Sequence, residues 1–72
     1  MNLAEDAYKL LRNGVEDSVE REVLEALVSK SAWWSYWYSR DVLKGRFERG
    51  EEEIGKSGGH KKLYEKLWGV KL

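Results

Sequence analysis

The chain has 72 residues, with 13 Lys and Arg against 13 Asp and Glu, a single His and no Cys. This length allows one small domain over residues 1–72 and excludes two, while the lone His and the missing Cys exclude a disulfide or a zinc ion as a structural staple. With 42% hydrophobic residues and four Trp, the chain is expected to fold around aromatic side chains or with the help of a partner.

The N-terminal part of the sequence predicts two short amphipathic helices. Asn2 can cap a helix over residues 3–12, which an Asn-Gly pair ends because both residues tolerate the left-handed conformation. Asp17 and Glu20 have the spacing of a capping box, and apolar residues follow them at helical intervals. We therefore expect a second helix over residues 18–29.

A third helix is predicted up to Gly45, with Ser29 or Ser31 as its N-cap. Five aromatic residues fall within six of its positions: Trp33, Trp34, Tyr36, Trp37 and Tyr38. At about 100° per residue, they cover an arc of roughly 200°, which is wider than a stripe that faces one core. This helix is expected either to lie between several neighbours or to present part of the arc to a partner.

The C-terminal third is rich in glycine and leaves room for a helical turn over residues 51–54 and a last helix over 61–68, which ends at Gly69. Leu63, Tyr64, Leu67 and Trp68 share one side of that helix. Thr is absent, and no segment alternates with a period of two. The predicted fold class is all-α, a compact bundle of four or five short helices.

A weak internal repeat is visible when residues 25–38 are aligned with residues 51–64. At this offset of 26, five of fourteen positions match: Glu25 with Glu51, Val28 with Ile54, Lys30 with Lys56, Ser31 with Ser57, and Tyr38 with Tyr64. The matches leave two interpretations open. They are either chance in a charged sequence or the trace of a degenerate helix-turn-helix repeat.

The balanced total charge conceals two blocks of opposite sign. Residues 1–29 carry seven acidic and three basic side chains, whereas residues 30–72 carry six acidic and ten basic ones. The first block therefore has a net charge of −4 and the second a net charge of +4.

Residues 50–57 match the letters GxxxxGKS of a phosphate-binding loop. That motif requires a turn between a buried strand and a helix, and neither the preceding residues nor the consecutive Glu51 to Glu53 suit it. We expect a helical segment with a glycine break instead. His60 is expected to be exposed at a helix start, so no catalytic set is predicted, and the protein is expected to be no enzyme and to bind no cofactor or metal.

The third helix carries the candidate partner-binding residues. Trp, Tyr and Arg dominate binding hot spots, although a small domain also uses aromatic residues as its core. Arg40 lies within reach of a cation–π contact with Tyr36 or Trp37, and Asp41 could accept a hydrogen bond from Trp37 or Tyr38. The predicted protein-binding set is Trp33, Trp34, Trp37, Arg40, Asp41, Lys44 and Arg46.

Two alternatives to a protein partner remain open at this point. The basic C-terminal half could bind nucleic acid through phosphate contacts and stacked aromatic rings, although the sequence pI near 6.6 and the interleaved acids count against it. A purely structural homo-oligomer is the other alternative. The composition predicts no membrane span, so a soluble cytoplasmic protein is expected.

The segment from Tyr36 to Glu51 reads YWYSRDVLKGRFERGE. It resembles a short repeat of uncharacterised proteins from tailed bacteriophages and related genomes, commonly YxYARDVLKGRFPEGE followed by an Ile and a Lys. The likeness covers residues 31–57, and this chain departs from the pattern by Ser39 in place of Ala and Glu48 in place of Pro. It implies a helical repeat, a phage origin and, by analogy, an accessory protein that binds and inhibits or modulates a host protein complex, for example a defence nuclease.

Overall fold

The computed structural model describes residues 2–72 as a bundle of short helices without a strand. The helical segments are α1 (Leu3–Asn13), α2 (Ser18–Val28), α3 (Ala32–Trp37), the π-helix η1 (Tyr38–Leu43), the 3₁₀ turn η2 (Glu48–Gly50), α4 (Glu51–Lys56) and α5 (Gly58–Trp68). This confirms the predicted all-α fold. None of the helices in the described part is long and apolar enough to cross a membrane.

The predicted N-caps of the first three helices are present. Asn2 Oδ1 accepts a hydrogen bond from the backbone of Glu5 at 3.1 Å, and Asp17 caps α2 in the same way. Of the two serines considered for α3, Ser31 is the cap, whereas Ser29 donates its hydroxyl hydrogen bond to a carbonyl of α2. Local side-chain chemistry therefore determines where these helices begin.

Several helix boundaries differ from the sequence prediction. Helices α1, α2 and α4 end at Asn13, Val28 and Lys56 rather than at residues 12, 29 and 54. The last helix begins at Gly58, three residues before the predicted start, because the extended Ser57 precedes it and its hydroxyl lies 2.9 Å from His60 Nδ1. The predicted third helix widens into a π-helix at Tyr38, and its left-handed end residue is Lys44, with φ 54°, rather than Gly45. The backbone N–H of Gly45 then donates to Ser39 O at 3.1 Å.

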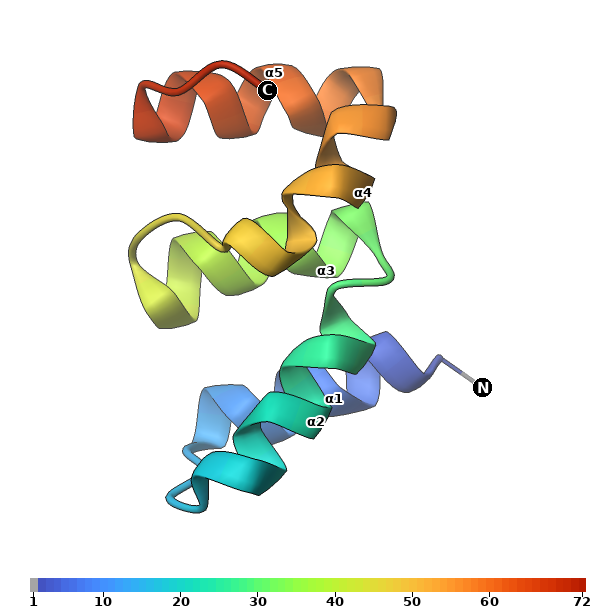
Figure 1. The fold of residues 1–72 in the computed structure, drawn as a ribbon, viewed down its shortest axis with the longest axis vertical. Helices are drawn as coiled ribbons and strands as arrows, with labels where there is room; N and C mark the ends of the chain where they lie inside the picture. The colour runs from blue at the N-terminus through green and yellow to red at the C-terminus, as the bar shows by residue number, and fades with distance from the viewer. Residues whose placement is uncertain (1) are drawn as a thin grey trace.

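The helix formed by α3 and η1 lies in the middle of the molecule (Figure 1). Helices α1 and α2 pack on one side of it, and α4 and α5 lie on the other. The wide aromatic arc thus faces two neighbours, which is the first of the two arrangements expected for it.

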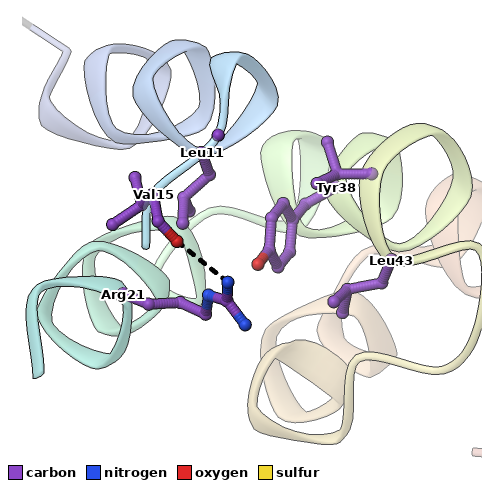
Figure 2. Close-up of a pocket in the computed structure, with 7 residues that line it drawn as sticks. Leu11, Val15, Arg21, Tyr38 and Leu43 are labelled. Atoms are coloured by element: carbon purple, nitrogen blue, oxygen red, sulfur yellow. Dashed lines mark hydrogen bonds between the residues drawn. The ribbon is translucent and has the colours of Figure 1, made fainter. Parts of the chain in front are cut away.

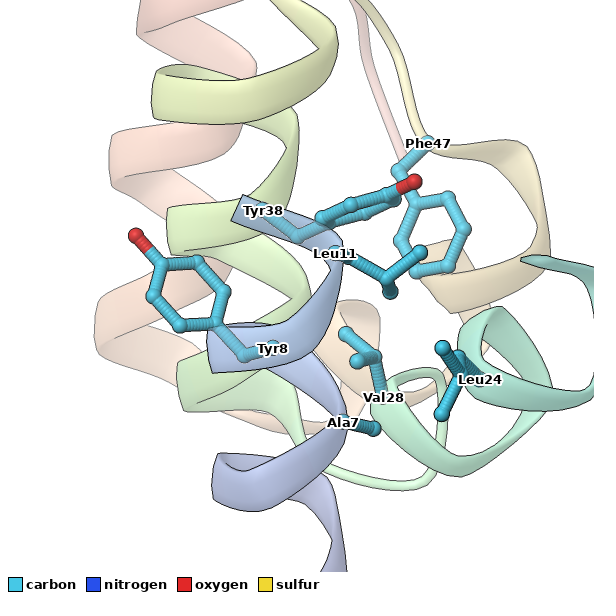
Figure 3. Close-up of a cluster of buried hydrophobic side chains, with 7 residues drawn as sticks. All are labelled: Ala7, Tyr8, Leu11, Leu24, Val28, Tyr38 and Phe47. Carbon is cyan, nitrogen blue, oxygen red and sulfur yellow. The ribbon is translucent and has the colours of Figure 1, made fainter. Parts of the chain in front are cut away.

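Each side of the central helix has its own hydrophobic cluster. The cluster toward α1 and α2 is shown in Figure 3 and consists of Ala7, Tyr8, Leu11, Leu24, Val28, Tyr38 and Phe47. The cluster toward α4 and α5 consists of Tyr36, Ile54 and Tyr64, with Trp37, Trp68, Val70 and Leu72 packed against it. Tyrosines of the central helix thus supply a buried ring to each cluster, as expected for a small domain without staples.

The weak sequence repeat corresponds to a repeated geometry. Tyr38 Oη donates to Glu25 Oε2 at 2.5 Å, and 26 positions later Tyr64 Oη donates to Glu51 Oε2 at 2.6 Å. Two of the other three matched pairs also share a role, because Val28 and Ile54 are fully buried, and Ser31 and Ser57 are the extended residues that precede α3 and α5. The two helix-turn-helix units are α2 with α3 and α4 with α5. Their descent from a repeat stays a prediction.

Gly50 allows the second unit to approach the central helix closely. A Cβ atom at this position would lie 2.5 Å from Ser35 Oγ and 2.7 Å from Phe47 Cδ2. Ser35 is itself completely buried and donates to Val28 O at 2.9 Å. Since real Cβ contacts are longer than these distances, only glycine fits where α4 begins.

Candidate protein-binding groove

The three candidate tryptophans lie in different surroundings. Trp33 is 50% exposed. Trp34 is half-buried, and its ring centroid lies 5.0 Å from that of Tyr8, so it belongs to the packing against α1. Trp37 is half-buried against both hydrophobic clusters, and the guanidinium of Arg40 lies 5.0 Å from its ring centroid. The predicted contact of Arg40 with an aromatic ring is therefore present, and Trp37 is the ring.

Asp41 and Lys44 are exposed on η1 and just after it. The hydrogen bond considered between Asp41 and Tyr38 does not form, because the Tyr38 ring points into the first cluster and its hydroxyl donates to Glu25 instead. Burial, together with that hydrogen bond, raises the pKa of Tyr38.

Arg46 is engaged within the chain. Its Nε and Nη2 atoms donate to the two carboxylate oxygens of Glu51 at 2.8 and 2.9 Å. The guanidinium lowers the pKa of the Glu51 carboxyl, which also accepts the hydrogen bond of Tyr64. Tyr64 Oη in turn accepts from the backbone N–H of Phe47 at 2.9 Å. In this geometry Arg46 is bound to the second unit, whereas Trp33 and Arg40 are exposed.

A groove of about 440 Å³ runs between the central helix and α5. Its lining consists of Tyr36, Arg40, Leu63, Lys66 and Leu67. Of the four residues that share one side of α5, only Tyr64 is fully buried, while Leu63 and Leu67 are 51% and 40% exposed. The two leucines therefore form the apolar floor of an open groove and are not core residues.

One part of this groove could be predicted from the sequence. Arg40 is in the predicted set, but the contribution of α5 depends on which helix lies beside η1, and that is a tertiary contact. The spacing of Leu63 and Leu67 predicts that they share one side of the last helix, but it does not tell whether that side faces a neighbour or a groove.

The rim of the groove is basic. Arg40 and Lys66 line opposite walls, and Lys62 is one turn away from Lys66 on α5. Among residues 2–72, none of these three side chains makes an ion pair. The one acidic residue of α5, Glu65, accepts a hydrogen bond from the backbone of Leu72 at 2.7 Å. The groove thus combines an apolar floor with uncompensated positive charge.

A second, smaller cavity of about 190 Å³ lies between the α1–α2 connection and η1 (Figure 2). Its polar groups already have partners. The Arg21 guanidinium donates to Val15 O at 2.8 Å, and the Tyr38 hydroxyl is bonded to Glu25. The remaining lining is mainly apolar or glycine: Leu11, Gly14, Val42 and Leu43. This cavity offers a ligand fewer free polar groups than the groove does.

The segment with the letters of a phosphate-binding loop is helical, as expected from the sequence. Gly50 ends η2, and the next six residues form α4. Glu51 is held by Arg46 and Tyr64, and Lys56 pairs with Glu52 and Glu53. Within residues 2–72, no group of three or more His, Cys, Asp or Glu side chains could hold a metal ion.

Comparison with protein-family models, with curated proteins and with solved structures finds no match for this chain. The class of protein that the fold and the site define is thus an all-α bundle of two helix-turn-helix units with an open basic and apolar groove.

Proposed function

We propose that this protein is a small, non-enzymatic protein-binding module and that the groove between the central helix and α5 is its binding surface. The observation that supports the proposal most is the combination of Leu63 and Leu67 as an exposed floor with Arg40 and Lys66 as uncompensated rim charges. Trp33 is half-exposed on α3, and its ring centroid lies 5.4 Å from that of His60 in α5. Exposed apolar side chains framed by polar ones are typical of interaction surfaces, and Trp and Arg are frequent anchors.

The resemblance of residues 31–57 to a phage repeat adds a more specific proposal. Under it, the partner is a host protein complex, for example a defence nuclease, that the module inhibits. This part rests on the resemblance alone, by analogy of origin. It therefore needs an experiment that identifies the partner.

Affinity capture from a lysate, followed by quantitative mass spectrometry, tests the binding surface. The groove variant replaces Arg40→Glu and Leu67→Glu together, two exposed positions whose change leaves both clusters intact. We expect it to lose at least one protein that the unmodified chain enriches, because a charge is reversed and an apolar contact is removed.

The matched control is Lys9→Glu with Leu10→Glu, which makes the same two types of change at exposed positions of α1. This control is expected to retain every captured protein. If the folded groove variant retains them all as well, the groove is not the binding surface.

Nucleic-acid binding is the second candidate, favoured by the row of lysines on α5 that form no ion pair within the described part of the chain: Lys61, Lys62 and Lys66. Exposed Trp33 could stack on a base. Titration of the chain with single-stranded and double-stranded oligonucleotides at low salt tests this function. It predicts binding that weakens steeply as salt rises, and no binding at low salt would eliminate it.

A further inference from the structure

The exposed side of α2 has the opposite character to the groove. Val19 and Val23, one helical turn apart, are 68% and 57% exposed. At about 100° per residue, Glu20 and Glu22 flank this pair on its two sides. Neither glutamate makes an ion pair with another residue of the described range 2–72. Arg49 reaches α2 only at its backbone, where it donates to Glu22 O at 2.9 Å. Helix α2 therefore presents two apolar side chains between two glutamates that form no ion pair within the described range.

The groove has the same layout with the sign reversed. Leu63 and Leu67 are also one helical turn apart, and their flanks are Lys66 on α5 and Arg40 across the groove. An acidic helix with two apolar residues one turn apart would place its apolar pair over the leucines and its carboxylates near the two cations. Helix α2 of this protein has that pattern.

The two surfaces cannot meet within one chain. The central helix separates α2 from α5, which lie toward opposite ends of the molecule (Figure 1). The charge distribution follows this separation, because residues 1–29 have a net charge of −4 and residues 30–72 a net charge of +4. A net charge of zero also removes the repulsion that keeps copies of a protein apart.

We propose that the groove of one copy binds α2 of a second copy in a head-to-tail contact. The inference rests on the proposed function, because it assigns a partner to the same groove. The contact joins two different surfaces, so each bound copy still offers a free α2 or a free groove. The assembly accordingly grows beyond a dimer as the concentration rises.

Sedimentation velocity of four purified chains tests this contact at low salt. They are the unmodified protein, the groove swap Arg40→Glu with Lys66→Glu, the α2 swap Glu20→Lys with Glu22→Lys, and the chain that carries all four changes. We expect the unmodified protein to assemble and each swap to weaken the association constant by about tenfold or more, since attractive rim pairs become repulsive. The chain that carries all four changes is expected to assemble again, because the charges of its groove and its α2 are again complementary.

Lys9→Glu with Lys30→Glu is the control, since it changes the net charge as the groove swap does but lies outside both surfaces. It is expected to assemble like the unmodified protein. The proposal is overturned if the unmodified protein remains monomeric up to about 0.5 mM. It is also overturned if the chain with all four changes associates as weakly as the groove swap and the α2 swap. A monomeric protein whose groove variant still loses a captured partner would contradict the self-contact and leave the proposed function standing.

Discussion

Gly50 is a residue at which the two units of the protein are in close contact. Its Cα faces Ser35 of α3, and a methyl group would overlap with Ser35 Oγ and the Phe47 ring. Both neighbours are buried, and Ser35 is held by its hydrogen bond to Val28 O, so neither can move aside cheaply. The position of the second unit on the central helix thus depends on the absence of a Cβ atom at residue 50.

We expect Gly50→Ala to lower the free energy of unfolding by about 1–3 kcal/mol through overpacking. Chemical denaturation followed by tryptophan fluorescence measures this change. Gly59→Ala is the control, because a Cβ atom there meets nothing within 4 Å and the residue lies in α5. The control should leave stability unchanged or raise it by up to about 1 kcal/mol. Equal losses in the two variants would contradict the close-approach explanation.

At the scale of helices, the two helix-turn-helix units share a tyrosine-to-glutamate hydrogen bond but differ in what else the hydroxyl binds. Tyr38 Oη bonds to Glu25 alone, whereas Tyr64 Oη also accepts from the buried backbone N–H of Phe47. The second unit is thereby connected to the segment that follows η1. The hydrogen bond of the first unit lies within its own helix pair.

This difference predicts unequal costs for the same substitution. Tyr38→Phe removes one hydrogen bond and is expected to cost about 1 kcal/mol of stability. Tyr64→Phe also leaves the Phe47 N–H buried without a partner and is expected to cost about 2–3 kcal/mol. Urea denaturation of both variants provides the comparison. A cost for Tyr38→Phe that equals or exceeds that of Tyr64→Phe would contradict the assigned role of the Phe47 contact.

The same tyrosines make the free energy of unfolding depend on pH in the alkaline range. Burial and the hydrogen bond to Glu51 raise the pKa of Tyr64 from 10.0 to about 12, and the pKa of Tyr38 is raised in the same direction. Above pH 10 the unfolded chain therefore loses protons that the folded chain keeps, so this contribution is complete below pH 10 and is lost as the pH rises toward 12. The urea midpoint should fall over this range, and less so for Tyr64→Phe. An equal fall in both chains would contradict the pKa assignment.

The helices could be predicted where local chemistry decides them. Asn2, Asp17 and Ser31 cap their helices through side-chain oxygens a few residues away, so the sequence alone contains the information. The π-helix at Tyr38 and the exposure of Leu63 could not be predicted in this way. Both depend on contacts between segments far apart in the chain, which residue spacing does not encode.

The candidate site could be predicted only in part for the same reason. Of the predicted set, Arg40 lines the groove, and its cation–π contact with Trp37 follows from their spacing on one helix. Arg46 was grouped with them by sequence proximity, but its bidentate pair with Glu51 turns it toward the second unit. The α5 half of the groove required the packing of the whole bundle.

At the scale of the molecule, the central helix organises both the core and the surface. Its arc is divided between two clusters, which leaves Trp33 and Arg40 toward solvent beside the open groove. The acidic block, residues 1–29, lies at one end of the molecule, and the basic block runs from the central helix to the other end (Figure 1). The balanced net charge is therefore a separation of charge along the molecule, and the basic end carries the groove.

Photo-crosslinking from inside the groove tests the central claim, that this groove binds protein, most directly. A benzophenone amino acid is placed at Leu67, on the floor of the groove, or at Leu3, an exposed leucine of α1 as the control. After irradiation in a lysate, we expect discrete protein adducts, to a second copy or to another protein, from position 67 that position 3 does not form. The same adducts from both positions, or none from position 67, would contradict the account.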